Sequence, residues 1–187
     1  MQFDEVLRSR RAVRSYSTER VDDATVHALL EAAVLAPSAM NEQPWAFSVI
    51  QDSARLKRYS DRAKQLVAAL AGGDRKAHHY RALFGDPSFD IFYGATTLVV
   101  IGVGERTTYT DADCWLAAEN LMLEACARGL GTCPIGFAVP VLNTVEVKDE
   151  LSIPPGGAAV APIIVGRPRE PAPPVPRAKP RVAAWLR

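Results

Sequence analysis

Residues 111–131 read DADCWLAAENLMLEACARGLG, and they predict a helix with apolar side chains around nearly its whole circumference. The apolar positions are Trp115, Leu116, Ala118, Leu121, Met122, Leu123, Ala125 and Cys126. A helix that is apolar all round needs cover on every side. In a domain as small as this one, a second subunit is a natural source of that cover. Glu119 and Asn120 interrupt the apolar surface, and each needs a hydrogen-bonding partner if it is buried.

Helix and strand patterns alternate along the rest of the chain. Helices are predicted for residues 22–36, capped by Asp22 and ended before Pro37, for residues 53–70, and for a short segment that ends near Leu151. Strands are predicted for residues 45–50, 95–103 and 158–166. Residues 95–103 form a continuous apolar run, which is typical of a central strand covered on both faces. The length and apolar content favour a single domain over residues 1–187.

Two segments carry neither pattern. Residues 73–94 are polar, aromatic and marked by Gly and Pro, and they predict a loop with a helical turn. Residues from about 166 to 187 contain six prolines and predict an extended arm that runs over a surface.

Charge and cysteine content exclude several classes of protein. The net charge of +1 argues against a bulk nucleic-acid binder. Three cysteines without CxxC spacing argue against a disulfide framework or a Cys-rich zinc site. The N-terminus carries no apolar signal segment, and no apolar run reaches the roughly 18 residues of a membrane span. We therefore expect a cytoplasmic protein without a membrane or nucleic-acid partner.

Residues 8–16 read RSRRAVRSY, which places four arginines within seven residues with no acid among them. Guanidinium groups bind phosphate through paired hydrogen bonds, so the cluster is a candidate phosphate site. A solvated basic face and a nucleic-acid-binding arm are the alternatives. The C-terminal segment is also basic, since only Glu170 opposes Arg167, Arg169, Arg177, Lys179, Arg181 and Arg187.

Two further segments combine turn residues with groups that can bind a ligand. APSAMNEQPWAF, residues 36–47, brings a hydroxyl, two amides and a Trp together, although turn chemistry alone explains these residue types. RGLGTCPIGFAVP, residues 128–140, contains a tight backbone segment whose N–H groups can face a ligand, although a helix C-cap is the alternative. Neither this segment nor GVGERT satisfies GxGxxG, and no phosphate-binding P-loop occurs.

Other candidate groups are isolated. His27 lies alone in a predicted helix, while His78 and His79 are neighbours in a polar loop, so no metal site is expected. Cys133 is either a reactive thiol or a small packing residue, and packing is favoured.

In this order, RRAVRSY, APSAMNEQPW and GLGTCPIG resemble the three flavin-contacting motifs of the FMN-dependent nitroreductase superfamily, and the resemblance covers nearly the whole chain. It implies an α+β fold, a nitroreductase-like α/β sandwich with a mixed central sheet flanked by helices. It also implies an intertwined homodimer with FMN at the interface, in which the helix of residues 111–131 is central and the C-terminal arm packs on the partner subunit.

The resemblance assigns cofactor contacts position by position. Around the FMN phosphate and ribityl chain it places the N-terminal arginines, with Arg10 and Arg14 as the expected side-chain contacts, and a basic residue of the arm. Ala12 stands where the family commonly has Ser, which removes a hydroxyl contact. The expected set is Arg10, Arg11, Ala12, Arg14, Pro37, Ser38, Ala39, Asn41, Gln43, Pro134, Ile135, Gly136, Arg177 and Lys179.

The function implied is an FMN-dependent NAD(P)H oxidoreductase that reduces nitroaromatic, quinone or related acceptors in a ping-pong cycle. The flavin carries the chemistry, so no catalytic side chain is expected. The alternatives are a flavin-storage protein and a specialised member similar to the family's dehalogenases or flavin destructases.

Overall fold

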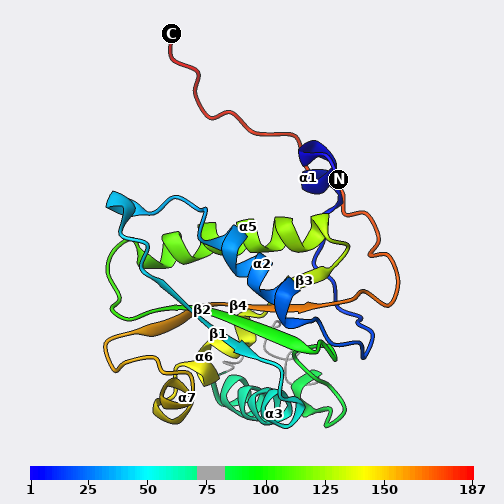
Figure 1. Ribbon diagram of the computed structural model, residues 1–187, viewed down its shortest axis with the longest axis vertical. Helices are drawn as coiled ribbons and strands as arrows, with labels where there is room; N and C mark the ends of the chain where they lie inside the picture. Colours follow the sequence, from blue (N-terminus) through cyan, green and yellow to red (C-terminus); the bar gives the residue numbers. More distant parts are fainter. Residues whose placement is uncertain (71–82) are drawn as a thin grey trace.

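The computed structural model describes residues 1–70 and 83–187 of the chain. It has three layers: a four-stranded sheet lies between one layer that contains α2 and α5 and another that contains α3, α6 and α7 (Figure 1). The helices are α1 (Phe3–Ser9), α2 (Asp23–Ala33), α3 (Ser53–Leu70), α5 (Thr110–Ala127), α6 (Val139–Leu142) and α7 (Val145–Glu150), with 3₁₀ turns η1 (Ala39–Asn41) and η2 (Gly136–Ala138). The strands are β1 (Trp45–Ile50), β2 (Thr97–Val103), β3 (Gly131–Pro134) and β4 (Ala158–Gly166).

The sheet has the strand order β1-β2-β4-β3, and its strands pair antiparallel throughout. Among the described residues, the parallel component of the expected mixed sheet is one isolated bridge between Ala12 and Thr132. The sequence analysis missed β3, because its four residues include Gly131 and Pro134, which are residue types depleted in strands.

β2 is a central strand covered on both faces, as predicted. Its side chains alternate between the two cores: Leu98 and Val100 pack in the core beside α3, whereas Val99 and Ile101 pack in the core beside α5. This alternation follows the two-residue period of a strand. Every residue of β2 is buried, which explains the uninterrupted apolar run in the sequence.

α5 is the predicted apolar helix, and its own chain leaves part of it uncovered. Trp115 and Leu116 keep 42% and 46% of their surface exposed. The helix ends through Gly129, which has a φ of +74°, and the N–H of Leu130 donates to the carbonyl of Ala125 at 2.8 Å. The predicted C-cap is therefore present.

The C-terminal segment lacks regular secondary structure, and its packing on a surface of the partner subunit stays a prediction. Residues 171–187 contain no helix or strand, and the arm projects from the body beyond α1 (Figure 1). Of the predicted loop at 73–94, residues 83–85 are helical, whereas residues 73–82, with His78 and His79, lie outside the described residues. In the described part of the chain, no helix has both the length and the apolarity needed to cross a membrane.

Candidate functional site

The arginine cluster and the C-terminal arm line one cavity of about 720 Å³. Two chain segments that are more than 150 residues apart in sequence meet there, at 10–15 and 170–177. The predicted site residues among its described lining are Arg10, Arg11, Ala12, Arg14 and Arg177. Lys179 is not among them.

The N-terminal segment is fixed by backbone contacts to the sheet. The N–H of Val13 donates to the carbonyl of Thr132 at 2.9 Å, and the hydroxyl of Tyr16 donates to the carbonyl of Val13 at 2.8 Å. Val13 is buried, whereas Ala12 and Arg14 on either side of it are exposed. The alternation of an extended chain thus directs Val13 inward and leaves Arg14 on the surface.

Each arginine has a different environment. Arg10 lies 3.5 Å from the Glu119 carboxylate, which gives that polar residue of α5 a partner. Arg11 donates to the carbonyls of Arg8 and Arg10, so its side chain holds the N-terminal backbone. The buried Nε of Arg11 has no hydrogen-bond partner among the described residues. Arg14 lies over the ring of Tyr93, with its guanidinium carbon 5.9 Å from the ring centroid.

This donor set fits a phosphate group. Four guanidiniums line the cavity, and Glu170 is the one carboxylate among its described lining residues. Arginine presents a fork of donors that matches a phosphate, and a cation over an aromatic ring is attracted to that ring. Tyr93 was not predicted, since no spacing in the sequence relates it to Arg14.

The segment Pro134–Gly136 begins at the last residue of β3, the strand whose Thr132 carbonyl accepts the hydrogen bond from Val13 in the arginine-rich segment. A side chain added at Gly136 would meet no atom within 4 Å, so the backbone there borders open space. Cys133 is only 2% exposed, and burial raises the pKa of its thiol although Arg14 and Arg10 act in the opposite direction. A raised pKa favours the packing role of this cysteine over a reactive thiol.

The loop of residues 37–43 lies at the other end of α5 (Figure 1). The N–H of Ala39 donates to the carboxylate of Asp113 in the first turn of α5. The last turn of α5 instead contacts α1, where the hydroxyl oxygen of Ser9 lies 3.4 Å from the sulfur of Cys126. Thirteen helical residues separate these contacts, a distance of about 20 Å along the helix axis. Arg10 reaches Glu119 between these two ends, but no residue of the loop is among the described lining of the arginine-lined cavity. Within one chain, the loop and this cavity are therefore not brought together.

The same loop has a strained backbone. Met40, Asn41 and Gln43 have φ values of 51°, 57° and 49°, a region that residues with side chains rarely adopt. Each such residue costs about 1–3 kcal/mol unless its surroundings impose the conformation, and strain of this kind clusters at functional sites. Within the loop, the Ser38 hydroxyl oxygen accepts a hydrogen bond from the N–H of Gln43 at 2.9 Å. Pro37, Asn41 and Gln43 are exposed.

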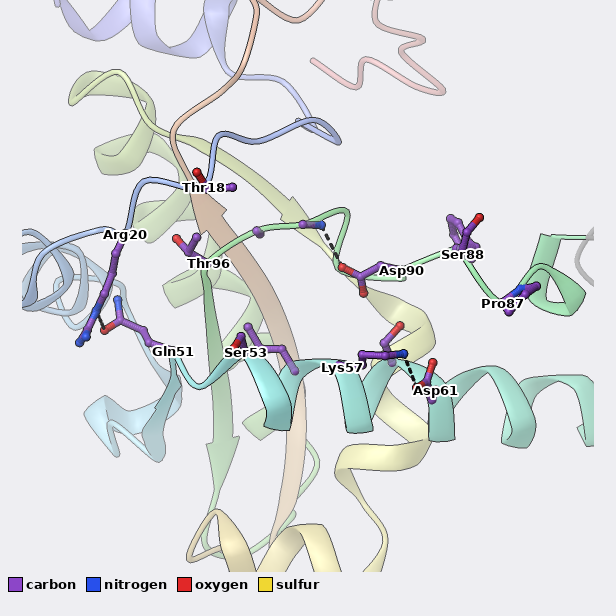
Figure 2. A pocket seen from close by; sticks show the side chains of 15 residues that line it. Thr18, Arg20, Gln51, Ser53, Lys57, Asp61, Pro87, Ser88, Asp90 and Thr96 are labelled. Carbon is purple, nitrogen blue, oxygen red and sulfur yellow. Dashed lines mark hydrogen bonds and ion pairs between the residues drawn. The ribbon is translucent and has the colours of Figure 1, made fainter.

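A second cavity of about 640 Å³ lies between α3 and the segment that leads into β2 (Figure 2). Its cationic side chains already have partners: Arg20 donates to Gln51, and Lys57 to Asp61 at 2.7 Å. The carboxylate of Asp90 accepts bonds from backbone N–H groups of its own turn. This cavity lacks the excess of positive charge found in the arginine-lined one, and the described residues contain no cluster that could hold a metal ion.

Comparisons with known proteins identify the family of this chain. A family model described as the Nitroreductase family matches residues 7–167. A 5,6-dimethylbenzimidazole synthase from Rhodospirillum rubrum is 33% identical over 184 residues, which cover 90% of this chain and 82% of that protein. A nitrobenzene nitroreductase from Ectopseudomonas oleovorans is 28% identical over an alignment of 200 residues, which covers 88% of this chain and 86% of that protein.

The fold also matches solved structures. A nitroreductase with bound FMN from Bacteroides fragilis superposes with a TM-score of 0.79 at 25% identity, covering 100% of this chain and 97% of that one. The expected α+β fold is confirmed. Because the family match spans most of the sequence, the chain belongs to the nitroreductase family.

Proposed function

We propose that this protein is an FMN-dependent NAD(P)H oxidoreductase that reduces nitroaromatic, quinone or related acceptors. The observation that carries the proposal is the convergence of arginines from both ends of the chain on one cavity. Membership of the nitroreductase family supports FMN as the group that this cavity takes.

In this proposal, Arg10, Arg14 and Arg177 hold the FMN phosphate, while Arg11 keeps the backbone around them in place. Lys179 contributes from the arm when the arm packs on the partner subunit. The backbone of Pro134, Ile135 and Gly136 lies near the reactive edge of the flavin. When bound, FMN supplies the capacity to accept a hydride and pass it to an oxidised acceptor.

The remaining contacts come from a second copy of the chain. The loop of residues 37–43 contacts the first turn of α5 and is absent from the described lining of the arginine-lined cavity, so in this proposal it serves the site of the other subunit. Its groups toward the flavin are Pro37, Ser38, Ala39, Asn41 and Gln43. The homodimer also covers Trp115 and Leu116, whose exposure in the single chain is otherwise unexplained. One open face then serves the nicotinamide and the acceptor in turn, which gives ping-pong kinetics.

The first test is the visible absorption spectrum of the purified protein before and after anaerobic NADPH. We expect a flavin spectrum that bleaches with NADPH and returns with menadione, together with steady consumption of NADPH when menadione is in excess. A protein that binds FMN without this turnover would instead be a flavin-storage protein. A colourless protein that refuses added FMN would refute the proposal.

A specialised activity is the second candidate, because the relative at 33% identity is a 5,6-dimethylbenzimidazole synthase. Aerobic incubation with FMN and NADPH, followed by mass spectrometry, separates the two. Accumulation of 5,6-dimethylbenzimidazole would favour the synthase, and its absence alongside menadione reduction would favour the oxidoreductase.

A further inference from the structure

Asp113 is a buried acid that the sequence analysis did not single out. It lies in the first turn of α5 with 4% of its surface exposed. Its Oδ1 accepts a hydrogen bond from the N–H of Ala39 at 3.1 Å. Its Oδ2 is buried and has no hydrogen-bond partner among the described residues.

The bond to Asp113 is the link between the strained loop and the body of the protein. The other hydrogen bonds of the loop are internal: Asn41 and Glu42 donate to the carbonyls of Ser38 and Ala39, and Gln43 donates to Ser38. Side-chain packing holds the loop only weakly, since Met40 is 93% exposed. In the described part of the chain, Asp113 supplies the one hydrogen bond from residues 37–43 to another element.

Fold stability alone does not explain an acid at this place. A buried carboxylate with one unpaired oxygen carries a desolvation cost, and an apolar residue of similar volume at a helix–loop contact avoids it. The partly positive N-terminal end of α5 reduces this cost without removing it. A fixed shape of the adjacent loop is a reason to keep the acid despite that cost.

We propose that Asp113 is a positioning residue, which holds the loop of residues 37–43, with its left-handed Met40, Asn41 and Gln43, in the shape that fits against the flavin bound by a second copy of the chain. This inference rests on the proposed function. Asp113 itself touches neither cofactor nor substrate, and it acts through the amide of Ala39.

The test compares Asp113→Ala with Asp113→Asn and with the control Asp111→Ala. Asn keeps an oxygen that can accept the bond from Ala39, whereas Ala does not. Asp111 lies in the same turn but pairs with the exposed Arg106, so its loss leaves the loop untouched. Hydrogen exchange of residues 37–43 is measured first, in FMN-free protein, and kcat/KM with NADPH and menadione is measured second.

We expect exchange in the loop to be about tenfold or more faster in Asp113→Ala, as the loss of a hydrogen bond to a charged group implies. In the same variant we expect kcat/KM to fall about tenfold and the visible circular dichroism of bound flavin to change. FMN affinity should stay within about threefold of the wild type, because the arginine cluster is intact. Asp113→Asn should restore both exchange and kcat/KM, and Asp111→Ala should match the wild type.

Unchanged exchange in Asp113→Ala would overturn the inference, and so would altered exchange with unchanged kcat/KM. Failure of Asp113→Asn to rescue either readout would also overturn it. A wild-type protein that takes up no FMN would remove the proposed function together with this role. That result is recognised separately, because the wild type is measured before any variant.

Discussion

Arg14 is the residue on which the cofactor proposal depends most directly. Its side chain leaves the extended N-terminal segment on the exposed side, lies over Tyr93 and lines the cavity. Arg11, its neighbour in the same motif, is instead engaged with backbone carbonyls. Identical residue types three positions apart thus have different environments: Arg14 faces the cavity, whereas Arg11 is bonded to the chain.

Replacing Arg14 with Ala should weaken FMN binding by about 1.5–3 kcal/mol, the range for a hydrogen bond to a charged group. Titration of FMN followed by flavin fluorescence measures the change. The control is Arg8→Ala, because Arg8 is exposed and pairs with Asp4 in its own helix. Equal FMN affinity in Arg14→Ala and the wild type would exclude Arg14 from the site.

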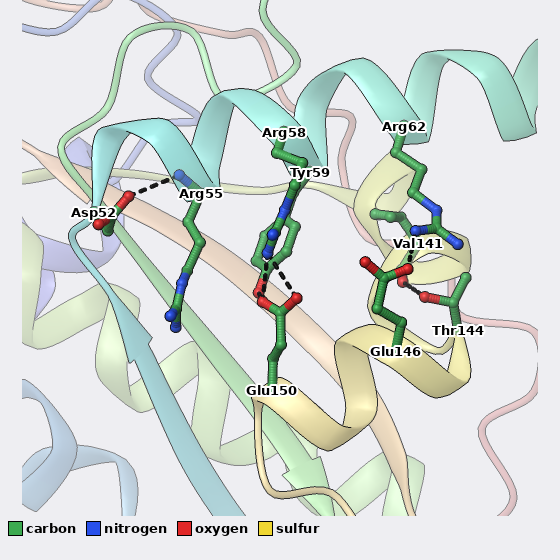
Figure 3. Close-up of polar contacts among 9 residues, drawn as sticks. All are labelled: Asp52, Arg55, Arg58, Tyr59, Arg62, Val141, Thr144, Glu146 and Glu150. Atoms are coloured by element: carbon green, nitrogen blue, oxygen red, sulfur yellow. Dashed lines mark hydrogen bonds and ion pairs between the residues drawn. The ribbon is translucent and has the colours of Figure 1, made fainter.

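Among the elements, α3 and α7 are joined by a polar contact on the side of the sheet away from α5 (Figure 3). Glu150 accepts hydrogen bonds from the hydroxyl of Tyr59 and from Arg58, both at 2.7 Å. Glu146, one turn earlier on α7, pairs with Arg62. Burial, followed by the bond to Glu150, raises the pKa of Tyr59 to about 12. The Tyr59 hydroxyl therefore stays a donor across the neutral range.

Replacing Glu150 with Ala should lower the free energy of unfolding by about 1–3 kcal/mol, because the partly buried hydroxyl of Tyr59 loses its acceptor. Glu146→Ala should cost about 1 kcal/mol or less, since that ion pair is largely exposed. Urea denaturation at pH 7 measures both values. Equal losses of unfolding free energy in the two variants would contradict a specific contribution of the Tyr59 hydrogen bond to stability.

The contribution of Glu150 should also depend on pH. The bond from Tyr59, helped by the charge of Arg58, lowers the pKa of Glu150 below its ordinary value of 4.5. A carboxyl group whose pKa is lower in the folded state stabilises the protein at pH values above its ordinary pKa. This stabilisation is lost as the pH falls through the folded-state pKa. The stability difference between wild type and Glu150→Ala should therefore shrink below about pH 4.5. A difference that stays constant down to pH 3 would contradict this.

At the scale of the whole molecule, exposed apolar side chains gather on the α5 side of the sheet. Leu35 and Met40 keep 81% and 93% of their surface exposed, in addition to Trp115 and Leu116 on α5. Large exposed apolar patches mark interaction sites, and our proposal assigns this one to a second copy of the chain.

Leu116→Asp should convert a dimeric protein into a monomer, because it places a charge in a surface that the proposed dimer buries. Light scattering coupled to gel filtration measures the mass, and bound flavin should be lost with the dimer. Val145→Asp is the control, since Val145 is 78% exposed on α7 at the opposite face. A dimer that survives Leu116→Asp, or a wild-type monomer that retains FMN, would contradict the prediction.

The sequence by itself determined the elements whose patterns are local. The bounds of α3 and β4 agree with the predicted residues 53–70 and 158–166, because helical periodicity and an uninterrupted apolar run each depend on neighbours in the chain. The arginine cluster was also identified before the fold, since its charge density needs no tertiary context. Its role as a phosphate site still rested on family resemblance, as a basic face has the same composition.

Only the tertiary structure decided which distant residues meet. It brought Arg177 into the cavity with Arg14, placed Tyr93 beneath that guanidinium and connected Asp113 to Ala39. It also made a strand of GTCP, which is too short and too rich in Gly and Pro to be recognised alone. These contacts depend on how β3, α5 and the two chain ends pack around the sheet. No pattern along the chain encodes such distances, because packing joins residues without regard to their separation in sequence.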